Sequence, residues 1–167
     1  MIPLPKPNTY PSYFKKYMSL VEDEVLTSLR KQRKKMKKFI YSDVDLDYSY
    51  APGKWTVRQS IMHIIDTERV FAYRALCISR GEQQVLPGFD QDSYARQDWS
   101  HVGRDQLWKE FNAVRRATMT LFQNMNQDML SRIGKVANND FSVCAVPYIC
   151  AGHLIHHMNV FKSTYRV

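Results

Sequence analysis

The chain has 167 residues, of which 44% are hydrophobic and 13% aromatic. This length and composition predict a single domain over residues 1–167 with a substantial core, and they exclude a disordered chain. The formal net charge of +8 would attract nucleic acid, but much of the excess is concentrated in one basic run at residues 30–38.

The N-terminal quarter predicts two helices after an extended start. Residues 1–9 are punctuated by prolines and are expected to be extended. A short helix is expected over residues 10–20 and a long one over residues 22–40, whose acidic start and lysine-rich end both favour the helix dipole. The basic run at residues 30–38 lies opposite an apolar stripe and has no interleaved aromatic residue. We interpret it as a solvated face, which makes nucleic-acid binding the least favoured function.

A second long helix is expected over residues 56–80, with Gly81 just beyond its C-terminus. Its apolar residues extend beyond one stripe, which indicates contact on several sides. Glu68 lies within the apolar stripe, where a charge needs a partner. The connection over residues 86–99 combines turn chemistry with three aromatic residues, which is typical of a lid or the wall of a site.

The C-terminal half predicts two further long helices, over residues 103–124 and 143–164. Between them, residues 134–143 are expected to form two short extended segments with a tight turn at Asn138-Asn139. Connections of mixed length between four main helices predict an all-α fold. We therefore expect a four-helix bundle with a short extra N-terminal helix and a long loop after the second main helix.

The cysteines and the chain termini indicate a compartment. The three cysteines are odd in number and include no C-x-x-C pair, which fits buried thiols in a reducing environment. The N-terminus has no apolar signal region, and no run approaches the ~18 apolar residues of a membrane span. A cytoplasmic protein without membrane attachment is therefore expected.

Histidines are concentrated near the C-terminus, where three of the five lie within residues 153–157. On a helix, His153 and His157 stand one turn apart on the same face, and His156 is rotated to the side. Two imidazoles so placed can bind one metal ion, with bonds of roughly 2.0–2.1 Å if it is zinc. A third ligand must come from another part of the chain.

Two histidines remain as candidates for the third ligand. His101 lies in a loop and is expected to face solvent, whereas His63 lies on the second long helix, which is expected to be contacted on several sides, and could face a cleft. Taken alone, a helical histidine is more often an ordinary, partly buried side chain. The three histidines together would leave one coordination position open, as catalytic zinc sites do. Imidazole ligands also suit nickel, copper or iron, so the metal is not determined.

Two acidic residues could support such a site. Asp66 and Glu68 could accept hydrogen bonds from metal-bound imidazoles, as carboxylates often do. Asp66 could equally be a solvent-exposed helix acid. Glu68 could equally pair with an arginine in the bundle such as Arg115.

Three further side chains have a functional and a structural interpretation. Cys150 lies about one turn before His153, but a small buried apolar residue is the simpler interpretation. Tyr148 and Trp55 could line a pocket. Core packing is the default for both aromatic residues.

Four short blocks occur in a distinctive order along the chain. They are Ala51-Pro52-Gly53-Lys54-Trp55-Thr56, His63-Ile64-Ile65-Asp66-Thr67-Glu68-Arg69, Leu86-Pro87-Gly88-Phe89-Asp90 and Gly152-His153-Leu154-Ile155-His156-His157. The ordered set resembles the DinB/YfiT-like superfamily of damage-inducible four-helix metal-binding proteins. The resemblance extends from about residue 10 to residue 165.

The resemblance implies an up-down-down-up type of bundle with a divalent metal held by His63, His153 and His157. It places His156 beside the site but outside the ligand set. Characterised members use their metal in thiol-dependent S-transfer, in isomerisation or in hydrolysis, and many have no established activity. Zinc or nickel is therefore expected before other ions, together with a small-molecule substrate and, for S-transfer, a low-molecular-weight thiol.

A metal with an open position can lower the pKa of bound water toward ~7, or hold and deprotonate a thiol. The leading hypothesis is a metal-dependent enzyme, thiol S-transferase-like or hydrolase-like, that acts on a small molecule in detoxification or stress response. The alternative is a non-catalytic metal-binding or stress-induced binding protein of the same fold. Bundles of this size often dimerise, so a homodimer is a further hypothesis.

Overall fold

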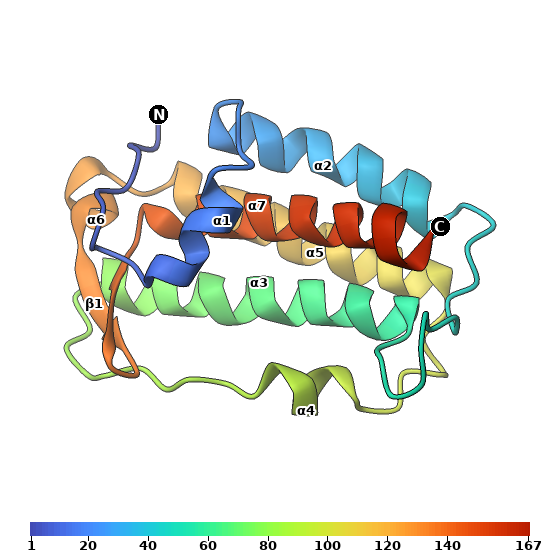
Figure 1. The fold of residues 1–167 in the computed structure, drawn as a ribbon. Helices are drawn as coiled ribbons and strands as arrows, with labels where there is room; N and C mark the ends of the chain where they lie inside the picture. The colour runs from blue at the N-terminus through green and yellow to red at the C-terminus, as the bar shows by residue number, and fades with distance from the viewer.

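The computed structural model describes residues 1–167 and is mostly helical (Figure 1). Its body consists of four long helices: α2 (Val25–Ile40), α3 (Val57–Ser79), α5 (Arg104–Gln123) and α7 (Ala145–Val160). Around the bundle, α2 contacts α5, α5 contacts α3, α3 contacts α7, and α7 contacts α2. The four helices therefore form a closed ring of contacts. No helix combines the length and the apolar composition that a membrane span requires.

The helix directions explain the longest connection. Helices α2 and α7 run one way along the bundle, and α3 and α5 run the other way (Figure 1). Because α3 and α5, which are consecutive among the four long helices, are parallel, the chain between them must return along the whole length of the bundle. That return carries the short helix α4 (Gln91–Ala95), which packs against α3.

Side-chain caps determine where the long helices begin. Helix α2 starts at Val25, later than expected, because the Glu24 carboxylate accepts the backbone N–H of Thr27 and so caps the helix. Helix α3 starts with a capping box, in which Thr56 and Gln59 each accept the other's backbone N–H. At the other end of the chain, α7 continues into a π-helical turn, η2 (Phe161–Tyr165).

The N-terminal segment packs on α7 through a very close approach. It forms a 3-10 turn, η1 (Ser12–Phe14), which continues into α1 (Lys15–Met18). The backbone of Tyr17 lies directly over Gly152, where an added Cβ would come within 1.9 Å of the Tyr17 carbonyl oxygen. Only glycine allows α1 to lie this close to the helix that carries the histidines.

Two five-residue helices, α4 and α6 (Gln127–Ser131), were not predicted from the sequence. Five residues are too few to show an apolar period. Both helices nevertheless start with a polar N-cap, Asp90 for α4 and Asn126 for α6, whose side chains accept backbone N–H groups of the first turn. These caps are the sequence signal that could have revealed the two helices.

The hairpin of β1 (Ile133–Val136) and β2 (Asn139–Ser142) turns one residue earlier than expected, at Ala137-Asn138. Ala137 adopts the left-handed conformation, with φ of 49°. The reason is tertiary: Leu86 pairs with β1, and its carbonyl accepts the backbone N–H of Ala137. This third segment fixes the register against the local preference of the two asparagines.

The buried apolar residues form two separate clusters along the bundle. Every long helix contributes to both, with a change-over point near its middle. At those points lie buried polar residues, which together form a layer across the bundle: Gln32 on α2, His63, Thr67 and Glu68 on α3, Arg115 and Thr118 on α5, and His153 on α7. The candidate site lies in this polar layer.

Candidate metal centre

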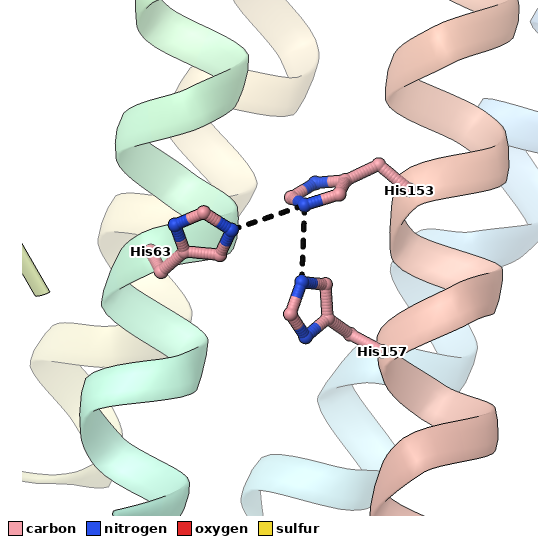
Figure 2. Close-up of side chains that lie close together, drawn as sticks. All are labelled: His63, His153 and His157. Atoms are coloured by element: carbon pink, nitrogen blue, oxygen red, sulfur yellow. Dashed lines mark hydrogen bonds between the residues drawn. The ribbon is translucent and has the colours of Figure 1, made fainter. Parts of the chain in front are cut away.

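The structure brings His63, His153 and His157 together at one point between α3 and α7 (Figure 2). The Nε2 atom of His153 lies 3.1 Å from Nε2 of His63 and 3.0 Å from Nε2 of His157. One ring nitrogen from each residue lies within 4.8 Å of the others. Two ligands of a tetrahedral zinc ion are about 3.3 Å apart, so the two spacings from His153 suit a shared ion.

The local structure explains this convergence. Residues 153 and 157 stand one turn apart on α7, and the antiparallel packing of α3 brings His63 opposite them. Two aromatic rings cover the cluster. Trp55 lies 4.7 Å from His63, and Tyr17 lies 5.4 Å from His153, both measured between ring centroids.

Burial keeps the three imidazoles neutral. It lowers the pKa of His63 to about 4 and the pKa of His157 to about 3, whereas an ordinary histidine has a pKa of 6.5. For His153, burial and then the neighbouring imidazoles lower the pKa well below its usual value. At neutral pH each ring therefore has a free lone pair, which is the state that metal binding requires.

The two acidic candidates form ion pairs elsewhere, and no hydrogen bond joins either one to a histidine. Glu68 is paired with Arg115, whose Nε donates to both carboxylate oxygens at 2.8 and 2.9 Å. This is the alternative that the sequence left open for Glu68. Asp66 is mostly buried and lies 3.6 Å from the Arg69 guanidinium. Neither carboxylate orients an imidazole in this structure.

The residue that does reach a histidine is Thr67, which sequence reasoning missed. Its Oγ1 lies 3.4 Å from Nδ1 of His63, the ring nitrogen that faces away from the cluster. An ion at Nε2 leaves the proton on Nδ1, and a hydroxyl oxygen can accept it. The spacing of four residues on one helix was the available signal.

His156 lies beside the cluster and contributes no nitrogen to it. Its ring packs against Tyr17 and His157, with centroid distances of 5.3 Å in both cases. Burial lowers the pKa of His156 as well. The structure thus places His156 as a flanking residue of the cluster.

The other candidates are part of the core or the surface. Cys150 is fully enclosed in an apolar cluster, and burial raises the pKa of its thiol well above the usual range. Tyr148 is also buried, and its hydroxyl donates to the backbone carbonyl of Ile2 at 3.0 Å. His101 is exposed.

Two cavities border the cluster on different sides. A cavity of about 340 Å³ reaches His153 and Thr67, and one of about 400 Å³ reaches His156 and His157. The connection between α3 and α5 supplies walls to both. It contributes Phe89 to the first cavity and Asp92 to the second.

Comparison with known proteins gives one family. The family model of the DinB superfamily matches residues 28–161. "Putative metal-dependent hydrolase OB0413" of Oceanobacillus iheyensis is 24% identical over 122 residues, which cover 72% of this chain and 70% of that protein.

Two solved structures share the fold. YfiT from Bacillus subtilis, described as a probable metal-dependent hydrolase with an unusual four-helix bundle topology, aligns with a TM-score of 0.72 at 16% identity and covers 98% of this chain and 91% of its own. The mycothiol-dependent maleylpyruvate isomerase aligns with a TM-score of 0.64 at 14% identity. That alignment covers 85% of this chain and 61% of the isomerase. At sequence identities of 16% and 14%, these two similarities are evidence for the fold alone.

Proposed function

This chain belongs to the DinB superfamily, and from that premise we propose that it is a divalent-metal-dependent enzyme of the hydrolase type. The proposed metal ligands are His63, His153 and His157. The observation that carries the proposal is the convergence of three neutral imidazole nitrogens within 4.8 Å. The descriptions of OB0413 as a "putative metal-dependent hydrolase" and of YfiT as "a probable metal-dependent hydrolase" support it.

The ligand set favours a catalytic site over a structural one. Structural zinc sites are closed by four protein ligands, whereas catalytic sites use three and keep one position open. The cluster contains no fourth histidine, cysteine or carboxylate. Three imidazoles suit zinc or nickel, which stay the expected ions.

A divalent ion at this point would polarise a substrate oxygen and lower the pKa of a water molecule toward neutrality. The chain's own residues supply the surroundings. Trp55 and Tyr17 shield the imidazoles from bulk water, and Thr67 can hold the outer proton of His63. Asp92 is the only carboxylate that lines the larger cavity, where it can accept a proton from a reacting group.

The size of the cavities supports a small-molecule substrate. Volumes of about 340 and 400 Å³ lie at the lower end of the range for small-molecule sites. A role in detoxification or stress response, a cytoplasmic location and a homodimer stay predictions from the sequence.

Metal analysis of protein purified without a histidine tag tests the ligand assignment. We expect about one divalent ion per chain in the unaltered protein, and loss of most of it in His63→Ala. The matched control is His101→Ala, because His101 is exposed and does not belong to the histidine cluster. Equal metal content in the unaltered protein and His63→Ala would refute the assignment.

Hydrolysis is tested with a panel of small esters and amides. Turnover should require the ion, disappear with a chelator, and return when the ion is restored. His63→Ala should be inactive, while His101→Ala should match the unaltered protein. Metal-independent turnover would contradict the proposed mechanism. A metal-loaded protein without any turnover would favour a non-catalytic metal-binding role.

Thiol-dependent transfer is the second candidate, favoured by the similarity of the fold to the mycothiol-dependent isomerase. No cysteine lies in the histidine cluster, and Cys150 is enclosed in the core. The thiol would therefore have to be a small molecule that binds at the open position. Metal-dependent consumption of a low-molecular-weight thiol in the presence of an electrophile would distinguish transfer from hydrolysis.

A further inference from the structure

The smaller cavity contains a buried arginine that the proposed metal chemistry does not use. Arg74 is on α3 and only 5% exposed. It lies two helical turns, about 10 Å, beyond Thr67 on the same face of the helix. Both residues line the cavity of about 340 Å³, which also reaches His153. The cavity thus extends from the histidine cluster to a guanidinium group.

The charge of Arg74 has no counterion in the protein. No carboxylate lies within 4 Å of it, and its one hydrogen bond runs from Nη2 to the carbonyl oxygen of Pro87 at 2.8 Å. Burial lowers the pKa of Arg74, yet a guanidinium stays charged in proteins. A buried cation of this kind is costly unless something pairs with it.

The surroundings of the guanidinium are aromatic. Its central carbon lies 5.4 Å from the ring centre of Phe71, 5.6 Å from Phe89 and 5.9 Å from Phe141. These rings stabilise the cation partly through their π faces. They also form apolar walls, which strengthen any electrostatic contact made inside the cavity.

We propose that this cavity binds a small organic carboxylate, with its carboxylate paired to Arg74 and its apolar body against Phe71, Phe89 and Phe141. A guanidinium can bind a carboxylate through two parallel hydrogen bonds. As the substrate class of the neighbouring centre, the assignment rests on the proposed metal-dependent function. The position of Arg74 places the anionic group at the end of the cavity away from the histidines.

The lining favours a carboxylate over a phosphate. Arg74 is the only lysine or arginine that lines the cavity. At the end of the cavity away from the histidines, one guanidinium matches the single charge of a carboxylate, whereas a phosphate ester carries close to two charges at neutral pH. The apolar body would extend from Arg74 toward the histidine end of the cavity, along the rise of about 10 Å that separates Arg74 from Thr67 on α3.

Binding is tested by isothermal titration of the protein as purified with 3-phenylpropionate and with its uncharged amide. We expect the acid to bind at least about tenfold more tightly than the amide, since charge-assisted hydrogen bonds are the stronger ones. Arg74→Gln should remove this preference. The matched control is Arg80→Gln, which removes an exposed arginine at the end of the same helix and should leave the preference intact.

Three results would overturn the proposal: equal affinity for acid and amide, a preference that survives Arg74→Gln, or inorganic phosphate competing as well as the acid. If Arg74→Gln does not fold, amide chemical shifts of the unaltered protein decide. The acid should shift Gly88 and Ala137, which line the cavity, more than the amide does. Because binding is measured and not turnover, the absence of hydrolysis would leave the result interpretable.

Discussion

Two polar clusters lie in the same layer of the bundle, between its two apolar cores. They differ in whether their polar groups find partners within the chain. In the first, Arg115 and Glu68 are 0% and 3% exposed and form a bidentate ion pair. Arg115 also donates a hydrogen bond to the side-chain carbonyl of Gln32 at 2.6 Å. The opposite charges cancel within the folded chain. This cluster is complete without a ligand.

In the second cluster, the proposed function requires a cation that the chain does not supply. His63, His153 and His157 present three neutral nitrogens to one another, and at most one proton can satisfy each close pair. Two cavities border this cluster. Both clusters are buried, so burial alone does not distinguish them. What distinguishes them, if the proposed function holds, is that the partner of the first cluster is part of the chain and the partner of the second is not.

The largest expected effect concerns the ion pair of Arg115 and Glu68. Glu68→Ala leaves Arg115 buried and unpaired, and should lower the free energy of unfolding by about 3–5 kcal/mol, measured by chemical denaturation. The control Asp66→Ala removes a carboxylate from a pair with the half-exposed Arg69, and should change stability by less than about 1 kcal/mol. Similar effects of the two substitutions would show that the buried pair is not the stabilising element.

The second largest effect concerns the three histidines, which should make the free energy of unfolding depend on pH. It is measured in protein treated with a chelator. Because burial lowers the histidine pKa values, the unfolded chain binds more protons than the folded chain below pH 6.5. Stability should therefore be full above pH 6.5 and fall as the pH decreases from 6.5 toward the folded-state pKa values, below which the loss levels off. The lowering of the pKa of His63 from 6.5 to about 4 corresponds to about 3 kcal/mol.

Denaturation curves between pH 7 and pH 4 measure this loss. His63→Ala should flatten the pH dependence, because it removes one of the groups that must stay neutral. His101→Ala should keep the dependence of the unaltered protein, since its side chain is exposed. If His63→Ala and the unaltered protein lose stability in parallel, the histidine cluster is not the source of the acid sensitivity.

Much of the fold was accessible from the sequence because the four long helices carry long apolar periods. The expected bounds of α3 and α5 differ from the observed ones by one residue at each end. The candidate ligands followed from the spacing of His153 and His157 and from the helical position of His63. The family resemblance then joined residues that lie 90 positions apart in the chain.

What the sequence could not show is how the helices face one another. The role of Glu68 depends on α5 lying beside α3, and the unpaired charge of Arg74 depends on which loops cover it. Thr67 and Asp66 are neighbours in sequence, yet only Thr67 faces the histidines. The sequence also does not show why a helix contains a glycine. Gly152 is the clearest case, because the segment that packs against it is distant in the sequence.

Gly152→Ala tests the close contact between α1, which carries Tyr17, and α7, which carries His153 and His157. An added Cβ would lie 1.9 Å from the carbonyl oxygen of Tyr17, so α1 must move away from α7. We expect a loss of about 1–3 kcal/mol by denaturation, together with faster hydrogen exchange in α1. The control Gly88→Ala meets no atom within 4 Å and should leave stability nearly unchanged. An unchanged α1 in Gly152→Ala would contradict the close contact.

The smallest effect concerns the outer proton of His63. Thr67→Val keeps the shape of the side chain but removes the hydroxyl that lies 3.4 Å from Nδ1. Metal affinity, measured by competition with a coloured chelator, should fall about tenfold, the lower end for groups that orient a ligand. The control is Thr118→Val, because Thr118 is equally buried in the layer and its hydroxyl has no partner. It should leave metal affinity unchanged. Equal affinities in the two variants would mean that the helix packing alone orients His63, and that the second cluster needs nothing but its ion.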